Sequence, residues 1–262
     1  MVPAEYAAFC EQVFSDWVAG NLHIAAPIQN TFLREYCPEP YLIFREGQRT
    51  LTFLTKNPGG GMDHQLRKNV RAGNPGIIDP KRPYIENARL LADWYEQYLG
   101  ERREDNKDTL RSEKKAATRI RKMKEIKDKA GYSGMIQLEV FPFHSKSLNV
   151  NHGLLQNALN DPLVSQFFEV TKKALKGLDV IAISGTGPNP NKSPYINFVA
   201  DLMGLDLKSA SAEVLVRNKN GPTGWLFHSR RDGFFRGIYA VRGNNNLPAE
   251  AGLQRIAKIL CP

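Results

Sequence analysis

The sequence predicts an α/β fold, a three-layer sandwich in which helices flank a mostly parallel central sheet. The first observation is that β-prone runs alternate along the chain with segments of helical spacing. The second is the run Leu178–Ser184, whose strongly apolar character is typical of a strand buried on both faces. The third is the length of 262 residues, which suits one large domain with a sizeable core. We therefore expect a single domain over residues 1–262, with a basic helical insertion at about 101–130.

The N-terminal part predicts one helix and two strands. Apolar residues recur at three- and four-residue spacings over residues 4–19, the pattern of an amphipathic helix, and Gly20 lies just beyond it. Two short β-prone runs, Tyr41–Phe44 and Leu51–Leu54, then enclose Glu46-Gly47-Gln48. Their simplest arrangement is a hairpin or a pair of adjacent strands.

The next segment changes from amphipathic to highly charged. Residues 83–99 have helical spacing, and Gly100 suits a C-terminal stop. Residues 101–129 then contain 12 Lys or Arg and 7 Asp or Glu, with only scattered aliphatic residues. We expect this stretch to bury little, and both a solvated charged helix and a DNA-contacting arm remain open.

Strands and helices alternate over the rest of the chain. The expected strands are Met135–Phe143, Leu178–Ser184, Glu213–Val216 and Gly237–Val241. The expected helices are Val164–Leu175, Ile196–Met203 and Pro248–Leu260. This order is typical of a mostly parallel sheet covered by helices on both faces.

The most informative stretch, residues 55–62, directly follows the predicted strand at 50–54. It places Asn57 at the strand's carboxyl end, where ligands bind in open α/β sheets. The three glycines that follow Pro58 bring bare backbone N–H groups close to a ligand; they are Gly59, Gly60 and Gly61. A simple Pro-Gly turn is the alternative.

The strand from Met135 alternates between apolar residues on one face and Gln137 and Glu139 on the other. A carboxylate near the end of a buried strand needs a partner or a ligand, because an unpaired buried charge is costly. Glu139 is therefore a second candidate site residue. The alternative is that it pairs with one of the many Lys or Arg side chains.

Two further strand ends carry polar and aromatic groups. After Glu139, the rings of Phe141 and Phe143 suit base stacking or the core, and Ser145 and Lys146 suit phosphate. Near the C-terminus, Arg242, Asn244 and Asn245 lie between a strand and the last helix. Asparagine there either caps that helix or contacts a substrate.

Composition excludes several classes of protein. Cys10, Cys37 and Cys261 are far apart and odd in number, which argues against a disulfide framework and indicates reduced, cytoplasmic thiols. No histidines have metal-ligand spacing on a helix, so we expect no metal and no cofactor. No run approaches the roughly 18 apolar residues of a membrane span, and the N-terminus does not resemble a secretory signal. No obligate protein partner is evident.

The order of these motifs resembles the uracil-DNA glycosylase superfamily, particularly its single-strand-selective and mismatch-specific branches. Their first motif, Gly-x-Asn-Pro-Gly, is matched from Asn57 onward, with Thr55 in place of the first glycine. Their middle motif has a base-reading asparagine on a strand, and Glu139 holds that position in Leu138–Pro142. Their last motif, His-Pro-Ser or Asn-Pro-Ser, falls at residues 243–246, where Asn244 stands for the leading residue and the proline and serine are missing.

The resemblance implies a DNA glycosylase, which flips a nucleotide out of DNA and hydrolyses the bond between base and deoxyribose. Asn57 would orient the water, and Asp63 would assist as a carboxylate. The glycine amides at 59–61 would contact the base or the flanking phosphates. Met62 and Asn244 would contact the base, and Asn245 the DNA backbone.

Glu139 changes the expected substrate. An ionised glutamate only accepts hydrogen bonds, so it suits the exocyclic amino group of cytosine and repels O4 of uracil. We therefore expect excision of a cytosine enlarged at position 5, with uracil as the second choice. Such an activity suits defence against phages that carry modified DNA, or base-excision repair.

Two other function classes stay open. A non-catalytic nucleic-acid-binding protein would account for the net charge of +9 and the pI near 9.4. A divergent P-loop NTPase would use Lys192, but Asn191 and Thr186 hold the positions where that loop requires glycine.

Overall fold

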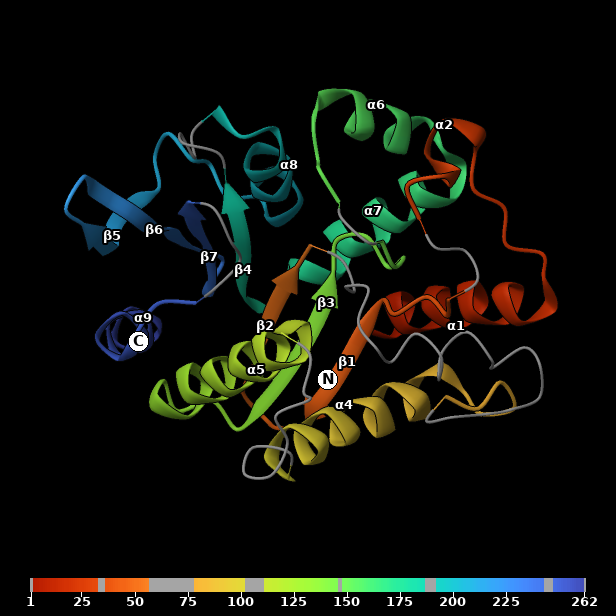
Figure 1. Ribbon diagram of the computed structural model, residues 1–262, viewed down its shortest axis with the longest axis horizontal. Coiled ribbons are helices and arrows are strands. Elements are labelled where there is room, and N and C mark those ends of the chain that lie inside the picture. The colour runs from red at the N-terminus through yellow and green to blue at the C-terminus, as the bar shows by residue number, and fades with distance from the viewer. Residues whose placement is uncertain are drawn as a thin grey trace.

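The structure is a computed structural model that describes most of the chain (Figure 1). The described residues are 2–32, 36–56, 78–101, 111–145, 148–186, 192–242 and 247–261, of which 97–101, 111–117 and 185–186 are described by backbone alone. The helices among them are α1 (Ala4–Ala19), α2 (Ala26–Gln29), α4 (Tyr84–Glu101), α5 (Arg111–Lys129), α6 (His152–Asn160), α7 (Pro162–Leu175), α8 (Pro194–Met203) and α9 (Glu250–Leu260). The strands among them are β1 (Tyr41–Arg45), β2 (Thr50–Thr55), β3 (Gly134–Glu139), β4 (Asp179–Thr186), β5 (Ser211–Asn218), β6 (Gly221–Arg231) and β7 (Phe234–Arg242).

These strands form one sheet in the order β1-β3-β2-β4-β7-β6-β5. The four central strands, β3, β2, β4 and β7, pair in parallel, whereas β1, β6 and β5 pair antiparallel. The predicted α/β class is therefore confirmed, and the sheet is mixed, with parallel pairing at its centre. Because the central strands are parallel, their carboxyl ends share one edge, at the top in Figure 1. We call it the carboxyl edge.

The predicted hairpin of the first two strands is wrong, because β3 lies between β1 and β2. The connection from β1 to β2 crosses the start of β3, where Gly47 and Gly134 meet. A Cβ on Gly47 would lie 2.7 Å from the Gly134 nitrogen, and a Cβ on Gly134 would lie 2.8 Å from the Gly47 nitrogen. Neither position has room for a side chain, so the crossing requires glycine at both.

Helix α1 has the predicted bounds. Gly20 ends it with a φ of 78°, a conformation that glycine adopts without strain. The buried stripe of α1 packs against α7 and the sheet; its members are Tyr6, Cys10, Val13, Phe14 and Trp17. Tyr6 joins the three elements, because its ring centroid lies 5.9 Å from that of Tyr41 on β1 and 5.8 Å from that of Phe167 on α7.

The basic region differs from its prediction in two respects. Helix α4 continues through Gly100 to Glu101 instead of ending there. The expectation that residues 101–129 bury little is wrong for the end of α5, where Ile120, Met123 and Ile126 are buried in the core. Helix α5 packs against β3 and α9, crossing the sheet in front of β2 and β3 (Figure 1). The three apolar residues follow helical spacing, so a charged composition conceals one buried stripe.

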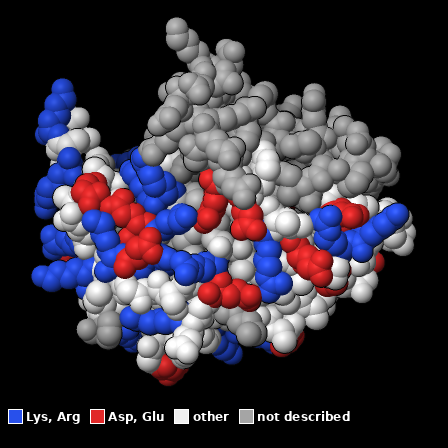
Figure 2. All heavy atoms as spheres, turned by 90° about the horizontal axis from the view of Figure 1, so that it is seen from below, with Lys and Arg blue, Asp and Glu red and all other residues white. Residues whose placement is uncertain are grey.

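Basic side chains of α5 and α9 are paired with acidic ones. Lys129 contacts Glu250 at 2.6 Å and Glu125 at 3.4 Å, and Arg255 pairs with Glu213. Figure 2, seen from the side opposite the carboxyl edge, shows acidic side chains among the basic ones over this region. This face is therefore no single-sign patch. Within the described residues, no helix is both long enough and apolar enough to cross a membrane.

Candidate functional site at the carboxyl edge

The four parallel strands all end at the carboxyl edge, and the chain continues from each into a segment outside the described residues. These segments are 57–77 after β2, 146–147 after β3, 187–191 after β4 and 243–246 after β7. Most predicted site residues fall there. The predicted residues outside the described part are Asn57, Gly59, Gly60, Gly61, Met62, Asp63, Lys146, Asn244 and Asn245.

The segment that begins at Asn57 starts from a fixed point. The backbone carbonyl of Lys56 accepts a hydrogen bond from the Phe141 N–H at 3.0 Å, which extends the pairing of β2 with β3 by one residue. The Lys56 ammonium donates to the Leu148 carbonyl at 2.5 Å. Burial lowers the pKa of Lys56. Lys56 therefore ties the end of β2 to the chain that follows β3.

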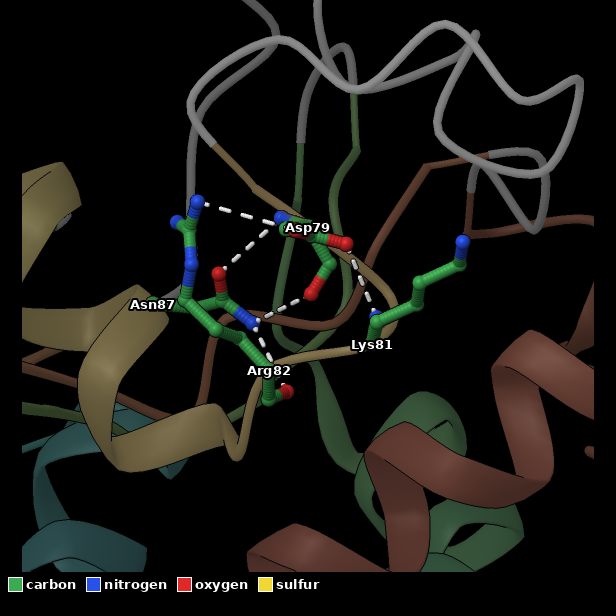
Figure 3. Close-up of polar contacts among 4 residues, drawn as sticks. All are labelled: Asp79, Lys81, Arg82 and Asn87. Atoms are coloured by element: carbon green, nitrogen blue, oxygen red, sulfur yellow. Dashed lines mark hydrogen bonds and ion pairs between the residues drawn. The ribbon is translucent and has the colours of Figure 1, made fainter.

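The same segment ends at a second fixed point, shown in Figure 3. Asn87, on α4, is buried and accepts from the Asp79 N–H at 3.0 Å. Its amide group donates back to the Asp79 carbonyl at 2.9 Å and to the Arg82 carbonyl at 3.2 Å. Ile78, the first described residue after the segment, is buried in the core. The chain on both sides of residues 57–77 is thus anchored to the sheet or to α4.

Glu139 is the last residue of β3 and lies opposite Thr55, the last residue of β2. Its side chain is 3% exposed. Its Oε1 accepts from the Gln137 amide nitrogen at 2.6 Å, whereas Oε2 has no hydrogen-bond partner among the described residues. Of the Lys and Arg side chains proposed as alternative partners, Arg119 on α5 acts on the charge of Glu139 and lowers its pKa. The last residue of β3 therefore carries a buried carboxyl oxygen that has no hydrogen-bond donor among the described residues.

The surroundings of Glu139 favour the protonated carboxyl. Burial raises its pKa to about 7, and the charge of Glu39 adds to the rise. Arg119 on α5 opposes that rise, as do the Thr55 hydroxyl and the Gln137 amide. The Thr55 hydroxyl itself donates a long hydrogen bond, 3.4 Å, to the Leu138 carbonyl. Near neutral pH, Glu139 is therefore divided between a form that donates a hydrogen bond and a form that only accepts.

Glu39 and His144 form a buried pair that the sequence analysis missed. The two side chains are 3% and 1% exposed, and His144 Nε2 lies 3.3 Å from Glu39 Oε1. The Glu39 N–H also donates to the Pro142 carbonyl at 2.7 Å, which joins the segment before β1 to the chain after β3. Glu39 lies between Pro38 and Pro40 just before an apolar strand, and that charged residue in a rigid, apolar setting is the signal available in the sequence.

The aromatic residues after β3 are core residues, the alternative that the sequence left open. Phe141 is fully buried and packs against Phe32 and Phe168, with ring centroids 6.0 and 5.4 Å apart. Phe143 is 5% exposed and lies 5.3 Å from Phe32. Ser145, predicted to bind phosphate, is buried as well. These rings hold the carboxyl edge together, and base stacking by them is not supported by their burial.

Arg242 lies at the end of β7. Of the predicted phosphate contacts that the structure describes, it is the exposed one. Arg242 is exposed, and its guanidinium lies 5.3 Å from the centre of the Trp225 ring. Beyond residues 243–246, the carbonyls of Leu247 and Pro248 accept from the Lys122 ammonium at 2.8 and 2.7 Å. Helix α5 therefore fixes the chain on the far side of Asn244 and Asn245.

Helix α8 brings one more side chain to Glu139. Ser193 caps this helix by accepting from the Ile196 N–H, and Tyr195 in its first turn is buried. Burial raises the pKa of Tyr195, and the nearby charge of Glu139 adds to the rise. Side chains from β3, α5, α8 and the segment before β1 therefore interact at one end of the sheet.

Among the described residues, no group of three or more His, Cys, Asp or Glu side chains is placed to hold a metal ion. Comparisons with protein families, with curated proteins and with solved structures found no match for this chain. The case for a function therefore depends on the residues and their geometry.

Proposed function

We propose that this protein is a DNA glycosylase that flips a pyrimidine, preferably a modified cytosine, out of DNA and hydrolyses its bond to deoxyribose. The proposal includes the three-layer arrangement of the fold, with DNA bound along the carboxyl edge. The observation that carries it is the buried carboxyl of Glu139, whose Oε2 has no hydrogen-bond partner in the described part of the chain. Glu139 lies in register with Thr55, two residues before Asn57.

The sheet topology supports the pairing of the two motifs. β2 and β3 are neighbours, and the Lys56 carbonyl is bonded to the Phe141 N–H. The first motif and the middle motif therefore leave the sheet beside each other, which a single site at a flipped base requires. Ligands of open α/β sheets bind at this edge of parallel strands.

The chemistry follows from the residue types. As the base leaves, the sugar resembles an oxocarbenium ion, so stabilising developing charge matters more than a strong nucleophile. The Asn57 amide has both a donor and an acceptor, which lets it orient water and contact the base. Asp63 assists that water. Glu139 accepts from the exocyclic amino group of a cytosine-type base.

The test is base excision by the purified protein. Single-stranded and duplex oligonucleotides with one uracil, cytosine, 5-methylcytosine or 5-hydroxymethylcytosine are incubated with it, and abasic sites are detected by alkaline cleavage. Asn57→Ala should abolish excision and keep most of the DNA affinity, since affinity depends on many phosphate contacts. Asn157→Ala, at an exposed position on α6, is the matched control and should leave excision unchanged.

The same assay separates the competing functions. DNA binding with no excision of any base would favour a non-catalytic nucleic-acid-binding protein. Hydrolysis of ATP that requires Mg²⁺ and is lost in Lys192→Ala would favour the NTPase. Strand β4 is followed by helix α8, and a P-loop also lies between a strand and a helix. Excision of uracil in preference to every cytosine derivative would contradict the role given to Glu139.

A further inference from the structure

Glu139 has a property that base reading alone does not use. It is a buried acid with one oxygen fixed by Gln137 and the other without a donor among the described residues. A carboxylate that only reads an amino group gains from being fully ionised, and a site for that purpose would place a cation against it. In the structure Glu139 is 3% exposed, and the charge of Arg119 lowers its pKa without offsetting the rise that burial causes.

The leaving group explains why an acid is useful at this position. Uracil departs as an anion whose charge is shared by two carbonyl groups. Cytosine has one carbonyl group fewer, so its anion is less stable and its bond to the sugar breaks more slowly. A proton placed on N3 during bond breaking lets cytosine leave as a neutral molecule. A buried acid at the edge of the base is the group that supplies such a proton.

We propose that Glu139 is a catalytic acid that donates its proton to N3 of an extrahelical cytosine-type base as that base leaves. This role rests on the proposed function. The C1′–N1 bond breaks, and its electron pair stays with the base while N3 takes the proton from Glu139. A water oxygen forms the new bond to C1′ and loses a proton. That proton returns to the Glu139 carboxylate, so the enzyme ends in its starting state.

The protonated acid also matches the shape of the base. Its O–H, on the Oε2 that no described residue contacts by a hydrogen bond, donates to N3, which is an acceptor in cytosine. Its Oε1 keeps a lone pair for the exocyclic amino group while it accepts from Gln137. The carboxylate form has no donor, so it contacts the amino group and repels N3. Productive binding and proton transfer therefore require the same form of Glu139.

The charged and titratable groups around Glu139 set the pH range of that form. Arg119 faces it from α5, Glu39 from the segment before β1 and Tyr195 from α8. Burial and the charge of Glu39 raise the pKa of Glu139, and Arg119, Thr55 and Gln137 lower it, which leaves it at about 7. The acid is therefore largely protonated at pH 6 and largely ionised at pH 8.

The test measures single-turnover excision of 5-hydroxymethylcytosine and of cytosine from pH 5.5 to 9. For the wild type, the rate should fall about tenfold per pH unit above pH 7. Glu139→Gln keeps a donor and an acceptor but has no proton to transfer. It should excise at least about 100-fold more slowly, with a flat pH profile. Its affinity for DNA with a non-hydrolysable 2′-fluoro nucleotide of the same base should stay within about threefold of the wild type, since the phosphate contacts are unchanged.

The outcomes separate this role from the proposed function. No excision of any base by the wild type overturns the proposed function and this role with it. Excision of a cytosine-type base at a rate independent of pH, or at the wild-type rate by Glu139→Gln, overturns the acid role alone. Excision confined to uracil also overturns it. Glu169→Gln, at an exposed position on α7, should match the wild type throughout.

Discussion

Thr55 and Glu139 lie opposite each other at the last register position of the parallel pair β2 and β3. Thr55 precedes Asn57 by two residues, and Glu139 precedes Phe141, whose N–H donates to the carbonyl of Lys56. Two motifs that are 82 positions apart in the sequence therefore leave the sheet as neighbours. The proposed function depends on this adjacency.

The first prediction concerns the stability of the fold and holds whatever the protein does. Burial raises the pKa of Glu139 from 4.5 to about 7, so the folded state holds this proton more tightly than the unfolded chain. The free energy of unfolding should therefore fall as the pH rises from about 4.5 to 7 and then stay level. Glu139→Gln removes that loss. The free energy of unfolding of Glu139→Gln, measured relative to that of the wild type, should therefore gain about 3 kcal/mol between pH 4.5 and pH 8.

Urea unfolding at the two pH values measures this gain. Glu169→Gln on α7 is the matched control, because its side chain is exposed, and it should gain nothing over the same range. If Glu139→Gln and the wild type differ in free energy of unfolding by the same amount at both pH values, the Glu139 carboxyl is as well solvated in the folded state as in the unfolded chain.

The second prediction tests the crossing of the β1–β2 connection over β3. Gly47→Ala should lower the free energy of unfolding by about 3 kcal/mol, because its Cβ would lie 2.6 Å from the Ser133 carbonyl carbon and 2.7 Å from the Gly134 nitrogen. The Ser133 hydroxyl could rotate away, but these two backbone atoms at the start of β3 could not. Gly177→Ala is the control, since its Cβ would meet no atom within 4 Å. Equal stability of the two variants would contradict the strand order.

The third prediction concerns Lys122, whose ammonium donates to the carbonyls of Leu247 and Pro248. Lys122→Met keeps the aliphatic stem and removes both bonds, so it should destabilise the fold by about 2 kcal/mol. It should also speed hydrogen exchange at the first turn of α9. Lys258→Met, at an exposed position on α9, should change neither quantity. Unchanged exchange in Lys122→Met would mean that α5 does not fix this part of the chain.

Local patterns predicted most elements because each has a strong signal of its own. The apolar stripe of α1 and the apolar run 180–183 in β4 are examples. Strand β6, Gly221–Arg231, was missed because it holds glycines, a proline and several basic residues, and it becomes a strand by pairing with β5 on one side and β7 on the other. The hairpin prediction failed for a related reason. Sequence spacing shows that two strands exist, but it does not show that a third strand lies between them.

The candidate site was also predicted only in part. Alternation along β3 correctly predicted that Glu139 is buried, since a polar residue on a buried strand has no other place to face. The neighbours that set its pKa could not be predicted. Arg119 and Glu39 come from distant parts of the chain, and only the packing of α5 and of the segment before β1 brings them to Glu139.

The fourth prediction concerns the opposed effects of two neighbours on the Glu139 carboxyl. Arg119 stabilises the carboxylate and Glu39 destabilises it. Arg119→Met should therefore raise the titration midpoint of Glu139, and Glu39→Gln should lower it, each by on the order of one pH unit. The midpoint is read from the carboxyl carbon shift of Glu139 in isotopically labelled protein, which requires no substrate. Gln at position 39 keeps the size of the side chain and removes only its charge.

Arg121→Met is the control for charge, because this neighbour on α5 is exposed and should leave the midpoint at about 7. If Glu139 is also the proton donor in base excision, the falling limb of the excision rate should move with the midpoint in both variants, in opposite directions. Midpoints that move while the rate profile stays fixed would mean that another group supplies the proton. Midpoints that do not move at all would mean that α5 and the segment before β1 lie too far from Glu139 to act on its charge.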